Sequence, residues 1–282
     1  MNFRKYLRDT TDRMESIKKI VMHQYGNLIT KFMMNVLEKS NVFENEYLKF
    51  MVVSNPRTGS TLLVHLLNSH PDILCHGEIF HWKAIFSMPL SEKKCLPALN
   101  DRNRNPVRFL EQLFSDGYGS KAIGIKMFQN HNPAMLNFLI RKREVKKIIL
   151  KRNNYLETYT SHLIAKQTKK YYNYPDGFVP PKVNVDPAKF LNYIKKNENF
   201  FTSVISQLEK TGQNYFLVDY KEILDKGIRK DLLEFIGVNS DISLTASNKK
   251  KQNPAKLSER ISNYSEIKEN LEGTPYENML DQ

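Results

Sequence analysis

Cysteines and long apolar runs are scarce in this chain of 282 residues. It has two cysteines, Cys75 and Cys95, too few for a disulfide framework. No stretch approaches the roughly 20 apolar residues that a membrane-spanning helix needs. The first residues, MNFRKYLRDTTDRMESIKK, lack the apolar core of a secretory signal. These absences predict reduced thiols and a soluble, cytoplasmic protein without an integral membrane segment.

Acidic residues are also fewer than basic ones, which leaves a formal net charge of +13. A surplus of this size favours anionic partners such as nucleotides, nucleic acid, sulfated or phosphorylated substrates, or a membrane face. For any single lysine, a purely solubilising role explains the charge equally well. The hydrophobic content of 40% and the charged content of 26% are typical of a folded globular chain with a sizeable core.

Apolar runs that suit buried strands alternate with segments of helical spacing. We predict strands at 48–54, 121–128, 146–151 and 214–220, with helices between them. Alternation of this kind predicts an α/β fold with three layers, helix–sheet–helix, and a mostly parallel central sheet. Residues 14–38 also show helical spacing, so we expect residues 1–47 to form a helical extension ahead of a domain at 48–282.

The stretch SNPRTGST follows the first predicted strand and precedes LLVHLL, which begins a helix. Such a turn points backbone N–H groups and the positive end of a helix dipole at one spot, which suits a phosphate or sulfate. The guanidinium of Arg57 adds a permanent positive charge and a planar set of N–H donors. The GK[ST] ending of nucleoside triphosphatases is absent, which disfavours a magnesium-dependent one. We predict a P-loop-like fold whose cradle comprises Arg57, Thr58, Gly59, Ser60, Thr61 and Leu62.

The longer segment PRTGSTLLVHLLNSHPDILCHGE resembles the 5′-phosphosulfate loop region of the sulfotransferase family. It looks most like the bacterial and carbohydrate branch and is similar to the tyrosylprotein branch. The family uses 3′-phosphoadenosine 5′-phosphosulfate (PAPS) and releases 3′,5′-ADP (PAP). The resemblance therefore implies a sulfotransferase domain at 48–282 that moves the sulfuryl group of PAPS to an acceptor hydroxyl by in-line displacement.

A second segment, IILKRNNYLETYTSHL, resembles the 3′-phosphate region of the same family. The match implies that Arg152 and a hydroxyl on the following helix bind the 3′-phosphate. That hydroxyl belongs to Ser161 or to its neighbour Thr160. An ion pair with a surface acid is the alternative for Arg152.

Two weaker matches complete the expected nucleotide site. VDYKEIL resembles a segment that follows a late strand in the family, which implies a contact from Tyr220, although Lys221 replaces the usual acid. The C-terminal region resembles a basic loop that closes over the nucleotide. Its candidates here are Lys250, Lys251 and Gln252, and a solvated basic run is the alternative.

The segment HGEIF places Glu78 where sulfotransferases of the tyrosylprotein branch carry their catalytic glutamate. The resemblance implies that Glu78 is the general base, although nearby cations would lower its pKa, and a salt bridge is the alternative. GIKMF resembles segments that supply a lysine to the sulfuryl group or the leaving oxygen in the family, which implies this role for Lys126; an ordinary lysine at the end of a strand is the alternative. His76 is a rival base, whereas His70 precedes a proline at a helix end and is expected to be structural.

His70, Cys75 and His76 superficially resemble a zinc set, but no fourth ligand stands at a suitable spacing, so we predict no metal. Acceptor specificity is expected in the loops at 83–105 and 168–186. Aromatic residues in these loops or next to them would stack on a sugar ring, flank a tyrosine or pack inside the protein; they are Trp82, Phe86, Tyr171, Tyr172, Tyr174 and Phe178.

The C-terminal resemblance favours a carbohydrate or glycolipid hydroxyl as the acceptor. A peptide tyrosine and a small metabolite stay open, as does the oligomeric state. We predict no nucleic-acid partner. Two functions of other classes are the alternatives: a P-loop kinase-like nucleotide enzyme, and a non-enzymatic protein that binds nucleic acid or another polyanion through its charge.

Overall fold

The computed structural model describes residues 46–81, 84–86, 99–115, 117–171, 178–245 and 256–280. The chain divides into two compact units, and of the first the structure describes two short helices, α3 (Leu99–Arg104) and α4 (Pro106–Ser115). The predicted helix at 14–38 lies outside the described residues, and the division at residue 47 stays a prediction. All other described elements belong to the second unit.

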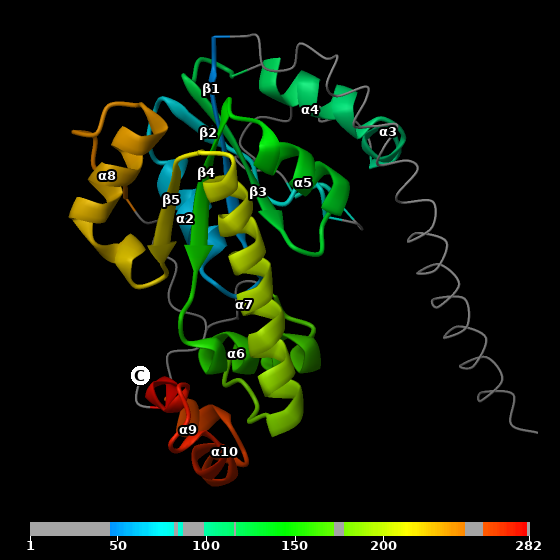
Figure 1. Cartoon of the computed structure of the whole chain (residues 1–282), viewed down its shortest axis with the longest axis vertical. Helices are drawn as coiled ribbons and strands as arrows, with labels where there is room; N and C mark the ends of the chain where they lie inside the picture. The colour runs from blue at the N-terminus through cyan, green and yellow to red at the C-terminus, as the bar shows by residue number, and fades with distance from the viewer. Residues whose placement is uncertain are drawn as a thin grey trace, which may run out of the picture. The chain divides into compact units, whose positions relative to one another are not determined.

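The second unit contains a sheet of five parallel strands in the order β2-β3-β1-β4-β5 (Figure 1). The strands are β1 (Leu48–Ser54), β2 (Ile73–Cys75), β3 (Ala122–Phe128), β4 (Val145–Lys151) and β5 (Tyr215–Asp219). Four of them lie within one residue of the predicted limits. β2 was not predicted, because three residues are too few to show a strand pattern.

Helices cover both faces of this sheet. On one face, α2 (Ser60–Leu67) and α8 (Lys226–Ile236) pack against a core that includes Phe50 and Ile148. The alternate strand residues Met51 and Ile149 are equally buried, and Figure 1 shows α5 (Pro133–Arg141) and α7 (Pro187–Lys210) over that opposite face. The three-layer α/β prediction is therefore confirmed.

A second apolar core joins α6 (Tyr155–Thr168) and α7 to the C-terminal elements. These elements are α9 (Leu257–Arg260), α10 (Tyr264–Leu271) and the 3₁₀ helix η2 (Glu277–Met279), at the red end of Figure 1. A parallel bridge between Val183 and Ile261 ties the segment ahead of α7 to α9. Sequence analysis missed these helices, since they are short and rich in polar residues.

The strand order places β1 at the centre of the sheet, with β3 on one side and β4 on the other. In open parallel sheets, ligands bind beyond the carboxyl ends of the strands at such a switch point. The β1–α2 turn, the end of β3 and the β4–α6 junction all lie at this edge. None of the described helices is long and apolar enough to cross a membrane.

Candidate active site

A tight turn joins β1 to α2. Arg57 and Gly59 both adopt left-handed backbone angles, with φ of 70° and 86°. A Cβ atom on Gly59 would lie 2.2 Å from Cδ2 of Tyr220, so both the conformation and the available space require glycine here. The turn brings the first N–H groups of α2, which have no partner inside the helix, to the carboxyl edge of the sheet. It thus has the geometry of an anion cradle, with Ser60, Thr61 and Leu62 forming the start of α2.

Hydrogen bonds of two buried hydroxyl groups stabilise the turn. The Oγ atom of Ser54 lies 2.5 Å from Oγ1 of Thr58 and also donates to the carbonyl of Leu150 at 3.0 Å. Thr58 Oγ1 donates to the carbonyl of Asn55 at 2.7 Å. The hydroxyl of Thr58 is buried and hydrogen-bonded within the turn. Thr58 is therefore left to contact a ligand through its backbone N–H.

The structure brings Arg57 together with Arg152 and Ser161, which follow it by about 100 residues in the sequence. Arg57 Nε donates to Ser161 Oγ at 2.8 Å, and Arg57 Nη1 donates to the carbonyl of Tyr171 at 2.8 Å. Arg152 Nη1 in turn lies 3.3 Å from the carbonyl oxygen of Arg57. Thr160, the other hydroxyl candidate, is completely buried, and its Oγ1 has no hydrogen-bond partner among the residues that the structure describes.

Arg152 is held by a buried ion-pair network, whereas the alternative considered from the sequence was a pair with a surface acid. Its Nη2 lies 3.2 Å from Oε2 of Glu157, whose other oxygen lies 2.7 Å from Nη2 of Arg260 in α9. The side chain of Arg260 is only 1% exposed. The guanidinium of Arg152 also stacks 4.6 Å above the ring of Tyr220, and this ring covers Gly59 on the cradle. One carboxylate therefore faces two arginines beside the cradle.

The start of α6 is fixed by a side-chain cap. Asn154 accepts a hydrogen bond from the N–H of Glu157 at 2.9 Å, and it donates to the carbonyl of Met279 at 2.9 Å. Caps of this kind satisfy one of the free N–H groups of a helix start. The same asparagine thus orients Glu157 and ties the C-terminal segment to α6.

A second cluster of charged side chains is buried at the ends of β2 and β3. Lys126 Nζ lies 3.0 Å from Oε1 of Glu78 and donates to Oγ1 of Thr61 at 3.2 Å. His131 Nε2 lies 3.5 Å from the other oxygen, Oε2. The exposed fractions are 4% for Lys126, 9% for Glu78 and 1% for His131. This cluster connects the predicted base to the first turn of α2, and His131 is a member that sequence analysis missed.

Burial by itself would raise the pKa of Glu78. The contact with His131 and the charge of Lys126 outweigh this effect and lower the pKa to about 2. Burial lowers the pKa of Lys126, and the carboxylate of Glu78 opposes that change. Glu78 is therefore ionised at neutral pH and neutralises the positive charge beside it.

The two rival histidines differ in their surroundings. Burial lowers the pKa of His76 to about 4, so its imidazole is neutral at physiological pH. His70 Nδ1 accepts a hydrogen bond from the N–H of Asp72 at 3.1 Å, and its Nε2 lies 2.9 Å from the carbonyl of Asn239. These backbone contacts agree with the predicted structural role of His70.

Acid will weaken the folded protein through Glu78. Its pKa is about 2 in the fold and 4.5 ordinarily, so its contribution is complete above pH 4.5 and is lost as the pH falls towards 2. The pKa difference corresponds to about 3 kcal/mol at pH 7, more than half of it lost by pH 3. Urea unfolding at pH 7 and pH 3 measures this loss. Between the two pH values, the free energy of unfolding should fall more in the wild type than in Glu78→Gln, whereas the exposed control Glu269→Gln should behave like the wild type. A constant gap between wild type and Glu78→Gln would contradict this assignment.

Several predicted residues lie outside the described part of the chain. They are Lys250, Lys251 and Gln252 of the basic loop, and the aromatic candidates Trp82, Tyr172 and Tyr174. Among the described aromatic candidates, Phe86 and Tyr171 are 41% and 46% exposed. Phe178 instead packs beneath Lys170, whose Nζ lies 4.2 Å from the ring centroid. The described residues contain no group of three or more His, Cys, Asp or Glu side chains that could hold a metal ion.

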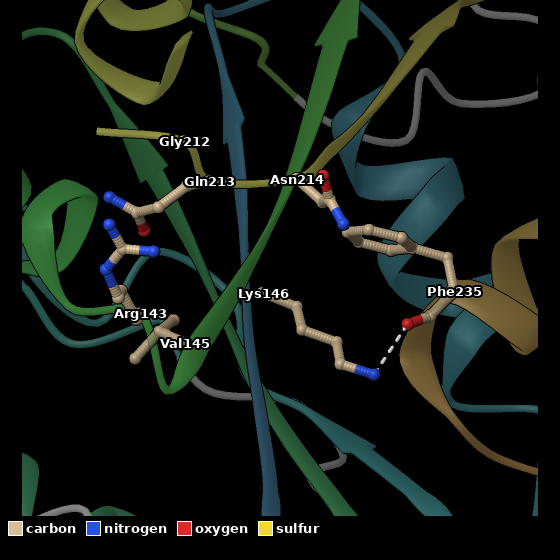
Figure 2. Close-up of a pocket in the computed structure, with 7 residues that line it drawn as sticks. All are labelled: Arg143, Val145, Lys146, Gly212, Gln213, Asn214 and Phe235. Carbon is tan, nitrogen blue, oxygen red and sulfur yellow. Dashed lines mark hydrogen bonds between the residues drawn. The ribbon is translucent and has the colours of Figure 1, made fainter. Parts of the chain in front are cut away.

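A pocket of about 410 Å³ lies at the opposite edge of the sheet, where β4 and β5 begin (Figure 2). Its lining residues are Arg143, Val145, Lys146, Gly212, Gln213, Asn214 and Phe235. Lys146 Nζ donates to the carbonyls of Phe235 and Ile236 at the end of α8, and Arg143 donates to the carbonyl of Thr211 at the end of α7. Both cations therefore cap helix ends, which is a structural role.

Comparison with known proteins identifies the family. Residues 50–220 match the profile described as "Sulfotransferase family". Nodulation protein H of Rhizobium tropici is 26% identical over 238 residues, which cover 80% of this chain and 90% of that protein. Nodulation protein H of Rhizobium meliloti (strain 1021) is 23% identical over 234 residues, which cover 80% and 92%. A crystal structure of a sulfotransferase from Alicyclobacillus acidocaldarius aligns with a TM-score of 0.44 at 14% identity, over 79% of this chain and 92% of that one.

The matched region includes the cradle, Glu78, Lys126 and Arg152, and it spans well over half of the chain. The resemblance seen in the cradle sequence is thereby confirmed: the chain belongs to the sulfotransferase family, whose activity is sulfuryl transfer.

Proposed function

We propose that this protein transfers the sulfuryl group of PAPS to a hydroxyl of a carbohydrate or glycolipid. The observation that carries the proposal is the convergence of Arg57, Arg152 and Ser161 beside the start of α2. PAPS has two anionic ends, a 5′-phosphosulfate and a 3′-phosphate. The arrangement offers a separate donor set for each end, the cradle for the first and Arg152 with Ser161 for the second.

The chemistry of these donors suits such a ligand. Guanidinium forks bind phosphate and sulfate in a bidentate manner, and backbone N–H groups at a helix start add donors without extra bulk. The close approach of Tyr220 to Gly59 shows that the cradle tolerates no side chain at that position. When bound, PAPS would supply an activated sulfuryl group, with PAP as the leaving group.

Charge on the reacting oxygens has to be neutralised by fixed donors. In our proposal Arg57 and the N–H groups at the start of α2 do this at the phosphosulfate, joined by Lys126. The hydrogen bond from Lys126 to Thr61 supports this role, because it holds the ammonium group beside the first turn of α2.

Glu78 is the proposed general base for the acceptor hydroxyl. A carboxylate with a pKa of about 2 is a weak base. In a displacement with a loose transition state, however, the acceptor hydroxyl becomes acidic as its oxygen bonds to sulfur. The proton can then be transferred late, and a weak base is sufficient to accept it. Each oxygen of Glu78 has two lone pairs, so the contacts with Lys126 and His131 leave room for one to the acceptor.

The acceptor class rests on the resemblance of the C-terminal segment to the carbohydrate and bacterial branch. The half-exposed rings of Phe86 and Tyr171 are available to stack on a pyranose face. Incubation with ³⁵S-labelled PAPS and a panel of oligosaccharides, glycolipids, tyrosine peptides and small alcohols tests this assignment. We expect label on a sugar; label on a peptide tyrosine would overturn the carbohydrate assignment and leave sulfuryl transfer intact.

Calorimetry with PAP, AMP and Mg-ATP tests the donor assignment. AMP lacks only the 3′-phosphate, so we expect PAP to bind at least tenfold more tightly, since charge-assisted hydrogen bonds contribute about 1.5–3 kcal/mol. For the same reason Arg152→Ala should weaken PAP binding about 10- to 100-fold and leave AMP binding nearly unchanged.

Arg108→Ala is the matched control, because it removes one exposed positive charge from α4. It should leave PAP affinity within about twofold. Equal affinity for PAP and AMP would refute a 3′-phosphate site. Tighter binding of Mg-ATP would favour the kinase-like alternative, and salt-sensitive binding of DNA without PAP affinity would favour the polyanion binder.

A further inference from the structure

His131 lies in the short turn between β3 and α5 and is clamped by one backbone residue. The N–H of Phe128 donates to Nδ1 of His131 at 3.1 Å, and the N–H of His131 donates to the carbonyl of Phe128 at 3.1 Å. Asn132 then caps α5 by accepting from the N–H of Met135. The backbone thus fixes both the position and the orientation of the imidazole.

This clamp also decides which ring nitrogen carries the proton. An Nδ1 atom that accepts a hydrogen bond has no hydrogen, so the neutral ring carries its hydrogen on Nε2. Nε2 faces Oε2 of Glu78 at 3.5 Å, while Lys126 occupies the other oxygen at 3.0 Å. The first contact is long for a hydrogen bond, as catalytic contacts often are before substrates bind.

We propose that His131 is a positioning residue for sulfuryl transfer, which holds the carboxylate of Glu78 at the angle that meets the acceptor hydroxyl. The inference rests on the proposed role of Glu78 as general base. Lys126 alone anchors one oxygen and leaves the carboxylate free to turn. A second anchor on Oε2 removes that freedom, and small misplacements of a catalytic group are costly to turnover.

Aromatic neighbours hold the imidazole in place. The ring centroid of Phe128 lies 4.8 Å away, and that of His81 lies 5.7 Å away in an edge-to-face arrangement. Phe86 packs against His81, with ring centroids 5.1 Å apart, and extends this row of rings towards solvent. Among the residues that the structure describes, the titratable and charged groups around the Glu78–His131 contact are Lys126 and His81, with buried Cys75 beside Lys126.

Two substitutions at this position separate positioning from packing. His131→Phe keeps an aromatic ring between Phe128 and His81 and removes both nitrogens. His131→Gln keeps a donor near the place of Nε2. With the best acceptor from the panel, we expect kcat to fall about 10- to 100-fold in His131→Phe and to stay within about threefold of wild type in His131→Gln. The Kd for PAP should be unchanged in both proteins.

Two readouts do not depend on an acceptor. In ¹⁵N-histidine spectra of the wild type, the neutral form of His131 should carry its hydrogen on Nε2. The contact also helps to lower the pKa of Glu78, so its loss should raise that pKa towards the ordinary value. Stability should then depend less on pH between 4.5 and 2 in His131→Phe than in the wild type, whereas His131→Gln should keep the wild-type dependence.

Three results would overturn the proposal. The first is wild-type or higher kcat in His131→Phe, because it would mean that the contact only suppresses the basicity of Glu78. The second is a spectrum with hydrogen on Nδ1 of His131. The third is an equal loss of kcat in both variants while thermal melts show both folded. Failure of wild type to bind PAP would refute the proposed function instead, and the spectrum and the acid stability would still test the contact.

Discussion

Replacement of Glu78 by glutamine will lower kcat about 10²- to 10⁴-fold, the usual range for loss of a general base. Glutamine has nearly the shape of glutamate, but its amide cannot take the proton of the acceptor hydroxyl. The nucleotide donors Arg57, Arg152 and Ser161 are untouched, so the Kd for PAP should change less than threefold. Initial rates at saturating PAPS, together with calorimetry, measure the two quantities.

The same substitution leaves the ammonium of Lys126 buried without its anion, which is destabilising in itself. Thermal melts must therefore show that Glu78→Gln is folded at the assay temperature. Glu269→Gln makes the same chemical change on the exposed face of α10 and should keep full activity. If folded Glu78→Gln retains a third or more of the wild-type kcat, Glu78 is only the counter-ion of Lys126 and the base lies elsewhere.

Much of the fold follows from local sequence patterns. β1 is a run of apolar residues interrupted only by Lys49, and it ends in a polar turn, so both its limits and the cradle could be predicted. α5 and α7 begin with proline after a capping Asn or Asp, which is a strong signal for a helix start. β2 could not be predicted, since pairing with β3 and not its own three residues makes it a strand.

Residues of the candidate site could be predicted from the sequence only where they belong to a recognisable motif. Arg57 and Glu78 lie in one continuous segment that resembles the family, and the structure places both at the same edge of the sheet. His131 lies in a polar turn, QNHNP, with no pattern of its own, and its role appears only when β3 brings it against Glu78. Arg260 is one arginine in a four-residue helix, and only the tertiary fold makes it a partner of Glu157.

The two charged clusters meet the cradle from opposite sides. Lys126 reaches α2 through Thr61, and Arg152 reaches the turn through the carbonyl of Arg57. In each cluster a glutamate balances the cation, Glu78 in the first and Glu157 in the second. Buried charges are tolerated only when they are paired, and these carboxylates compensate the cations of the site.

Arg260→Ala is expected to reduce the free energy of unfolding by about 3–5 kcal/mol, the usual cost of removing one partner from a buried ion pair. Arg260 is almost wholly buried, and its guanidinium lies 2.7 Å from Glu157. Its loss also leaves a cavity where α9 packs on α6, which adds to the cost. Glu157 would then depend on Arg152 alone and hold it more firmly. We therefore expect weaker PAP binding as well as lower stability.

Chemical denaturation and calorimetry test both expectations. Arg108→Ala, on the exposed face of α4, should change stability by less than about 0.5 kcal/mol. A double-mutant cycle of Arg260→Met and Glu157→Gln isolates the pair, and we expect a coupling of about 1–3 kcal/mol between the two sites. Additive effects, with Arg260→Ala losing less than about 1 kcal/mol, would mean that the ion pair contributes little. The C-terminal helices would then be held by their apolar core alone, and Arg260 would not affect how firmly Glu157 holds Arg152.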